Sequence, residues 1–215
     1  MIAYITYITM VTYDLSHLTQ AENQAVLGPI QDDEALFLFA LIRGMRLRHV
    51  LELGGLDGYS ARNFLKAVGP EGVVYTCDIH PVTSLAPNHR ILTKNCLELS
   101  VKDLDATPLD LLFFDCHDEV QRKLFERFVS LGLVRDNTIL ALHDTGLHFS
   151  PWQCEWAEPV DGGFVHQRVE RDMVGWLRET HGYDVLNIHT TPEKHSDAFP
   201  YRHGLTVCQK NIAFT

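Results

Sequence analysis

The chain has 215 residues, 46% of them hydrophobic, which suffices to bury a full core and fits one α/β domain. Its formal net charge of -10 disfavours a broad basic surface of the kind that binds a phosphate backbone, so we expect no nucleic-acid partner. No run approaches the roughly 20 apolar residues that span a bilayer, and the apolar start, residues 1–13, lacks the basic leader of a secretory signal, so we expect no membrane partner.

The alternation of short and long apolar patterns predicts the order of the elements. Residues 1–30 are expected to form a β-like N-terminal arm. Acids at the start of residues 32–44, with Arg43 and Gly44 at their end, predict a capped helix. From His49 onward, short β-branched runs alternate with longer periodic ones, which is typical of βαβ units and a parallel sheet. We expect strands at residues 49–53, 73–78, 90–93, 109–115, 138–143, 183–188 and 203–209, and helices at residues 58–68, 119–131 and 168–181.

Two late segments complete this pattern. Residues 190–202 are too few to hold a crossover helix comfortably, so the last strand is expected to run antiparallel to its neighbour. Residues 146–167 form a long loop with Trp152, Trp156 and the pair Gly162-Gly163, which predicts either a hinged lid or aromatic packing beneath a loop. We therefore expect a single α/β domain with a seven-stranded, mostly parallel sheet and helices on both faces.

A glycine loop, residues 54–58, separates the strand at 49–53 from the helix that follows. This arrangement places backbone N–H groups and a helix N-terminus around one concave spot, where a small ligand can bind. The dinucleotide fingerprint fails, because its second and third glycine positions hold Leu56 and Tyr59. Glu52 and Asp57 flank the turn, and two carboxylates would repel a pyrophosphate but suit an ammonium and a sulfonium. S-adenosylmethionine fits that description.

Asp78 closes the next strand, where an acid can accept hydrogen bonds from both hydroxyls of a ribose. A nicotinamide dinucleotide and S-adenosylmethionine both carry such a ribose, so this acid does not separate them. An NAD(P)-dependent oxidoreductase on a Rossmann sheet therefore stays open as an alternative function.

The sequence Glu52-Leu53-Gly54-x-x-x-Gly58-Tyr59-Ser60 resembles the first motif of class I methyltransferases, closely that of catechol-type and caffeoyl-coenzyme-A-type O-methyltransferases. Residues 110–115 and 139–145 look like strands 4 and 5 of macrocin-type sugar O-methyltransferases. The resemblance covers residues 31–145, the expected cofactor-binding core, and implies a Rossmann-like fold that binds S-adenosylmethionine. The cofactor-binding residues that it implies are Glu52, Gly54, Gly58 and Tyr59 in the first motif, Ser60 at the carboxylate, Asp78 at the ribose, Ile79, Asn95 and Cys96 at the adenine, and Asp115.

The densest group of titratable residues follows two strands that are expected to be neighbours, at residues 115–119 and 143–144. Methyl transfer is an in-line displacement, so a base or a metal ion is needed beside the cationic methyl group. Two carboxylates with one imidazole can hold Mg²⁺ or another hard ion, which makes Asp115, His143 and Asp144 metal candidates. The macrocin-type resemblance implies His117 as general base, and His143 and Asp144 stand beside it as catalytic candidates. Alternatively, these side chains only cap a helix and a turn.

The predicted function is transfer of a methyl group to a hydroxyl of a small molecule, such as a sugar or a phenol, by base- or metal-assisted displacement. Catechol-type enzymes carry Asp-Asn after strand 5 and a lysine just past strand 4, whereas this chain has His143-Asp144 and Asp118. A catalytically silent fold that still binds S-adenosylmethionine is therefore a further alternative. Five cysteines without Cys-x-x-Cys spacing indicate reduced thiols in the cytoplasm. A homodimer is also considered.

Overall fold

A computed structural model describes residues 13–18, 30, 32–116, 120–146, 149–150, 158–160, 163–165, 168–188 and 204–211. The main strands are β1 (His49–Leu53), β2 (Val73–Asp78), β3 (His89–Thr93), β4 (Leu111–Phe114), β5 (Ile139–His143), β9 (Tyr183–Ile188) and β10 (Leu205–Lys210). The α-helices are α1 (Asp32–Met45), α2 (Tyr59–Val68), α3 (Val120–Ser130) and α4 (Arg168–His181). Shorter elements are the 3-10 helices η1 (Ser16–Leu18), η3 (Cys96–Glu98) and η4 (Val101–Leu104), and the strands β6 (Phe149–Ser150), β7 (Glu158–Val160) and β8 (Gly163–Val165).

The main sheet has seven strands in the order β3-β2-β1-β4-β5-β10-β9. The five strands from β3 to β5 pair in parallel, and β10 pairs antiparallel with both β5 and β9. This confirms the expected seven-stranded, mostly parallel sheet with an antiparallel last strand. The order reverses direction at β1 and β4, and ligands of open α/β sheets bind at the carboxyl ends of the strands beside such a point.

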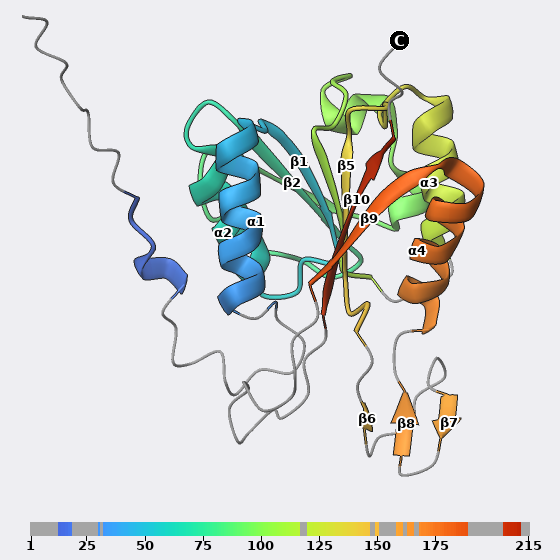
Figure 1. Ribbon diagram of the computed structural model, residues 1–215. Helices are drawn as coiled ribbons and strands as arrows, with labels where there is room; N and C mark the ends of the chain where they lie inside the picture. The colour runs from blue at the N-terminus through green and yellow to red at the C-terminus, as the bar shows by residue number, and fades with distance from the viewer. Residues whose placement is uncertain are drawn as a thin grey trace, which may run out of the picture.

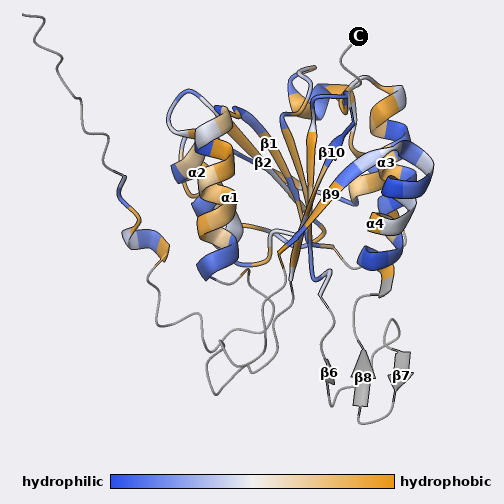
Figure 2. Cartoon of the chain, in the orientation of Figure 1, coloured by the Kyte–Doolittle hydropathy of each residue, from blue (hydrophilic) through white to orange (hydrophobic). Residues whose placement is uncertain are grey.

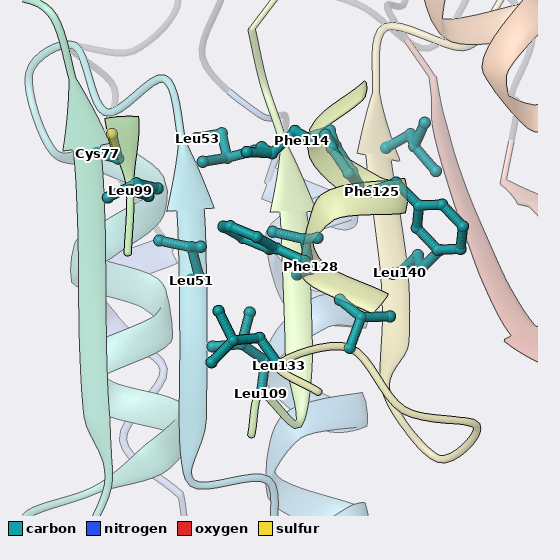
Figure 3. Close-up of a cluster of buried hydrophobic side chains, with 14 of the residues drawn as sticks. Leu51, Leu53, Cys77, Leu99, Leu109, Phe114, Phe125, Phe128, Leu133 and Leu140 are labelled. Carbon is teal, nitrogen blue, oxygen red and sulfur yellow. The ribbon is translucent and has the colours of Figure 1, made fainter. Parts of the chain in front are cut away.

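Helices cover both faces of the sheet, with α1 and α2 on one side and α3 and α4 on the other (Figure 1). Alternate residues of each strand point to opposite faces. Val50 therefore joins the cluster under α1 and α2, whereas Leu51 joins the cluster under α3. Figure 2 shows apolar residues concentrated in the sheet and on the inner sides of the helices. Figure 3 shows Phe125 and Phe128 of α3 among the leucines of the sheet, all of them fully buried.

The arm and the late loop differ from their sequence predictions in the parts that the structure describes. Instead of a strand, residues 16–18 of the arm form the 3-10 helix η1, because the Asp14 carboxylate accepts hydrogen bonds from the backbone N–H and the hydroxyl of Ser16. Within residues 146–167, the strands β6, β8 and β7 form a small antiparallel sheet that the sequence pattern did not predict. Trp152 and Trp156 lie outside the described residues, so the lid stays a prediction.

Element boundaries agree with the sequence to within a few residues. The strand expected at residues 109–115 is shorter, because β4 ends at Phe114 and leaves Asp115 just beyond the sheet. Between β2 and β3, the crossover at residues 79–88 contains no helix and runs over the glycine loop. None of the helices in the described ranges is both long and apolar enough to cross a bilayer.

Candidate functional site

The glycine loop begins at the carboxyl end of β1 and is packed tightly against its neighbours. Gly54 has φ +90°, and a Cβ added there would overlap the carbonyl oxygen of Asp115. Its N–H donates a hydrogen bond of 2.9 Å to the carbonyl oxygen of Cys77. Only glycine has both the backbone freedom and the absence of a side chain that this position requires. The loop is therefore in contact with the carboxyl ends of both β2 and β4.

The other end of the loop begins helix α2. Gly58 is the N-cap residue, with φ 72° in the left-handed region, and no side chain of the described residues caps the helix there. Its own N–H donates to the carbonyl oxygen of Gly55 at 2.6 Å. A helix N-terminus carries partial positive charge and N–H groups without intrahelical partners. The first turn of α2, which holds Tyr59 and Ser60, is thus suited to a small anionic group such as a carboxylate.

Glu52 lies beneath the loop instead of beside it. Its side chain is fully buried and accepts hydrogen bonds from the Ser60 hydroxyl and, at 2.7 Å, from the Thr76 hydroxyl. Burial raises the pKa of Glu52 to about 8, and the nearby charges of Asp115 and Asp78 act in the same direction. The sequence argument treated Glu52 as a charged carboxylate beside the turn. In the protein without a ligand, burial instead favours the protonated form of Glu52 near neutral pH.

The burial of Glu52 follows from strand geometry, because alternate residues of β1 face α1 and α2. The other flanking acid, Asp57, is exposed. The sequence argument against a pyrophosphate ligand therefore rests on Asp57 and on the acids at neighbouring strand ends. The hydroxyl of Ser60 is bonded to Glu52, so its expected role at a ligand carboxylate stays a prediction.

Asp78 shapes the glycine loop from the end of β2. One carboxylate oxygen accepts the N–H groups of Gly55 and Leu56 at 2.9 and 3.1 Å, and the other accepts the N–H of His80 at 2.8 Å. A carboxylate offers about four acceptor positions, which leaves room for a ribose hydroxyl. Ile79, the next residue, exposes 67% of its surface and so can contact a flat ring.

Two further residues predicted at the adenine follow β3. The side chain of Asn95 accepts the N–H of Leu97 at 2.9 Å and caps η3. Cys96 is half-buried and packs against the same core cluster as Cys116, just beyond β4, and its proximity helps to raise the pKa of the Cys116 thiol. This contact brings the end of β3 to the same edge of the sheet as the glycine loop.

Asp115, His143 and Asp144 come together as one group at the carboxyl ends of β4 and β5, here called the acid-imidazole cluster. The His143 Nδ1 atom lies 2.9 Å from an Asp115 carboxylate oxygen and 3.4 Å from one of Asp144. One potential ligand atom from each of the three residues lies within 4.8 Å of the others. Asp144 has φ 59°, a left-handed conformation that aspartate tolerates better than most residues. The structure thus brings together the residues that were predicted to bind a metal ion.

A third carboxylate reaches this cluster from α1, and sequence reasoning did not single it out. Glu34 is fully buried, and its Oε2 atom lies 3.3 Å from His143 Nε2. In the sequence, Glu34 belongs to a run of three acids at the start of a helix, which indicates favourable interaction with the helix dipole. The available signal was its spacing, because Glu34, Leu38 and Ile42 share the buried side of α1.

The electrostatics of His143 are governed by these carboxylates. Burial alone would lower the pKa of His143, but the charges of Asp144 and Asp115, the hydrogen bond to Asp115 and the nearby Glu34 carboxylate outweigh it. Together they raise the pKa well above its usual value. Without a metal ion, the surrounding acids therefore favour the protonated form of the ring. The donor set of two carboxylates and one imidazole suits a divalent cation, which would take the place of the Nδ1 proton.

His117, the predicted general base, and its neighbours Asp118 and Glu119 lie outside the described residues. The structure therefore does not place them relative to the acid-imidazole cluster. Asp115 keeps 15% of its side chain exposed, whereas the side chain of His143 is fully buried. Of these two residues, Asp115 is the better placed to touch a substrate.

No protein-family model matches the chain, and no curated protein matches its sequence. Solved structures do match. An O-methyltransferase from Bacillus cereus in complex with S-adenosylhomocysteine aligns over 94% of this chain and 93% of its own, with 16% identity and a TM-score of 0.60. The O-methyltransferase TomG from Streptomyces achromogenes, in complex with S-adenosylmethionine, aligns over 94% and 92%, with 18% identity and a TM-score of 0.57. The S-adenosylhomocysteine-bound methyltransferase PaMTH1 from Podospora anserina aligns over 92% and 87%, with 14% identity and a TM-score of 0.58. The chain therefore has the Rossmann-like fold of class I methyltransferases.

Proposed function

We propose that this protein transfers the methyl group of S-adenosylmethionine to a hydroxyl of a small molecule. The observation that carries the proposal is the contact between the glycine loop and the acid-imidazole cluster, where Gly54 packs on the backbone of Asp115. A ligand held by the loop would lie next to the strand ends that carry the reactive side chains. The solved O-methyltransferases of the same fold that bind S-adenosylmethionine or S-adenosylhomocysteine support this choice of cofactor.

The residues of the loop would bind and orient the methyl donor. The first turn of α2 suits its carboxylate, and the buried Glu52 becomes a favourable partner for its ammonium once it loses its proton. Asp78 remains able to accept a ribose hydroxyl, with Ile79 beside it for the adenine. These contacts fix the donor in one orientation, which is the main contribution that an enzyme makes to an in-line displacement.

The acid-imidazole cluster would receive the acceptor hydroxyl. A divalent cation held by Asp115, His143 and Asp144 would supply a lower pKa for that hydroxyl. The buried ring of His143 would help to hold the cation. The partly exposed Asp115 or the predicted base His117 would accept the proton of the acceptor hydroxyl.

The experiment is a calorimetric titration with S-adenosylhomocysteine, followed by transfer of labelled methyl groups to a panel of phenols and sugars. Gly54→Ala is expected to weaken binding at least about tenfold, because the added methyl displaces the loop or Asp115. Gly175→Ala in α4 is the matched control, since a Cβ there meets nothing within 4 Å. Tighter binding of NADH than of S-adenosylhomocysteine would contradict the proposal. Tight S-adenosylhomocysteine binding without transfer to any acceptor would favour the catalytically silent alternative.

The proposal also covers where the protein is found and what it acts on: we place it in the cytoplasm, with a small-molecule acceptor. Cys77 and Cys208 are free and buried, which suits the reducing conditions of the cytoplasm. The acceptor is proposed to be a small molecule, since the site lies at a strand edge of the kind that binds small ligands in this fold class. The homodimer, the absence of a nucleic-acid partner, and the division into arm, core and lid stay predictions of the sequence.

A further inference from the structure

Glu34 is a buried carboxylate to which the proposed function assigns no role. Its side chain and that of His143 are both completely buried, and 3.3 Å separates its Oε2 atom from His143 Nε2. Nδ1, on the other side of the same ring, lies 2.9 Å from Asp115. The imidazole thus has a carboxylate close to each nitrogen, with an ion-pair contact to α1 at Nε2 and a hydrogen bond to Asp115, at the end of β4, at Nδ1.

The local structure of α1 holds the Glu34 side chain in place. The neighbouring acids Asp32 and Asp33 are exposed, and only Glu34 lies on the buried side of the helix. The amide of Asn63 in α2 donates to the carbonyl oxygen of Ala35 at 2.8 Å, which fixes α1 against α2 one residue further on. Because Glu34 lies in the first turn, the positive end of the helix dipole offsets part of the penalty for burying its charge.

We propose that Glu34 is a positioning residue that sets the tautomer and the orientation of His143 for binding a divalent cation. With its carboxylate 3.3 Å from Nε2, Glu34 favours the proton on that nitrogen and so leaves the Nδ1 lone pair directed at Asp115 and Asp144, where the cation would bind. Metal-bound histidines almost always donate their second N–H to a carboxylate, a carbonyl or water, and removing that partner typically weakens metal binding 10- to 100-fold. The inference rests on the metal site of the proposed function and extends it to α1.

A purely structural role makes a different prediction. If Glu34 only attached α1 to the sheet, replacing it would change the melting temperature and leave the metal ligands as they are. If Glu34 positions the ring, replacing it changes metal binding: the protein binds the cation with lower affinity, and the magnetic coupling between the cation and the imidazole nitrogen becomes weaker. The amide oxygen of glutamine can also accept the Nε2 proton, so the conservative variant should restore both properties.

The test measures Mn²⁺ binding to the full chain by electron paramagnetic resonance, with imidazole coordination followed by pulsed measurements of nitrogen coupling. We expect Glu34→Leu to bind Mn²⁺ about 10- to 100-fold more weakly with reduced coupling, and Glu34→Gln to stay within about threefold of the wild type. Asp33→Asn is the control, because it removes an exposed acid from the same turn.

If Glu34→Leu fails to fold, Glu34→Asp replaces it. The shorter carboxylate cannot reach the ring, so it should bind Mn²⁺ more weakly than Glu34→Gln despite keeping its charge.

Any of three results with the variants would overturn the inference: an unchanged Mn²⁺ affinity and coupling in Glu34→Leu, equal losses in Glu34→Leu and Glu34→Gln, or Glu34→Asp binding at least as tightly as Glu34→Gln. A wild-type protein without imidazole-bound Mn²⁺ would also overturn it. S-adenosylhomocysteine is titrated into the same samples without metal, so this outcome is distinguishable from failure of the proposed function. Intact S-adenosylhomocysteine binding would leave the methyl-donor proposal standing.

Discussion

Glu52 is a fully buried acid beneath the glycine loop, and its protonation links the site to pH. Its pKa is about 8 in the folded protein, against 4.5 for an ordinary glutamate, chiefly because burial penalises the charged form. The folded state therefore holds this proton more tightly than the unfolded state does. The resulting contribution to stability is complete below about pH 4.5 and is lost as the pH rises towards 8, at roughly 1.4 kcal/mol per pH unit.

Glu52→Gln should remove this loss, because an amide does not titrate. We expect the free energy of unfolding of the variant to rise relative to that of the wild type between pH 5 and about 8, without ligand. Urea denaturation at several pH values measures the difference. Glu71→Gln serves as the control, since the Glu71 side chain is 81% exposed and should give a difference that does not change over this range. A flat difference for Glu52→Gln would mean that Glu52 is already ionised in the folded protein.

The buried hydroxyl of Thr206 connects the antiparallel strand β10 to its neighbours by hydrogen bonds near the site. The Thr206 hydroxyl lies 2.6 Å from that of Thr145, just after β5, and 2.8 Å from the side-chain oxygen of Asn187 in β9. A hydroxyl has one proton, so Thr206 donates to Asn187 and accepts from Thr145. This chain of hydrogen bonds connects β9, β10 and the residue that follows Asp144.

Thr206→Val keeps the shape of the side chain and removes these hydrogen bonds. We expect the free energy of unfolding to fall by about 1–3 kcal/mol, because the buried Thr145 hydroxyl loses the Thr206 hydroxyl as a partner. Thr206→Ser keeps the hydroxyl and should lose less than the valine variant. Denaturation of the three proteins in urea makes the comparison, and equal losses for valine and serine would assign the effect to packing instead.

At the scale of the molecule, S-adenosylhomocysteine should stabilise the whole fold, since the proposed site is built from β1, β2, β4 and α2 together. S-adenosylhomocysteine at 100 times its Kd should add about 2.7 kcal/mol to the free energy of unfolding. The melting temperature should therefore rise steadily with ligand concentration, which scanning calorimetry measures. Gly54→Ala should flatten this rise, whereas the Gly175→Ala control should reproduce the wild-type curve.

Much of the fold could be predicted because hydrophobic periodicity and the lengths of connections are local properties. The seven strands, their mostly parallel pairing and the antiparallel β10 follow from these properties alone. The small sheet of β6, β7 and β8 could not be predicted in this way, because strands of two or three residues carry too little pattern. The 3-10 helix η1 was missed because the Asp14 side chain competes with the backbone for hydrogen bonds.

The positions of Asp78 and of the acid-imidazole cluster could be predicted from the strand ends, because parallel strands bring their carboxyl ends to one edge. Glu34 was missed because its contact with His143 depends on how α1 packs across the sheet. The charge of Glu52 was misjudged, since a motif gives the residue type without its burial. Tertiary packing, which the sequence pattern does not express, accounts for both.

The hydrogen bonds that the N–H groups of Gly55 and Leu56 donate to Asp78 have a kinetic consequence. They hold the loop in one shape before any ligand arrives, so the entropy of ordering it is lost during folding and not during binding. Association at this part of the site then needs no slow rearrangement, and its rate is set by diffusion and entry. Substitutions that loosen the loop without removing a ligand contact should therefore slow capture of the cofactor, because only a fraction of the molecules would present the loop in its binding shape.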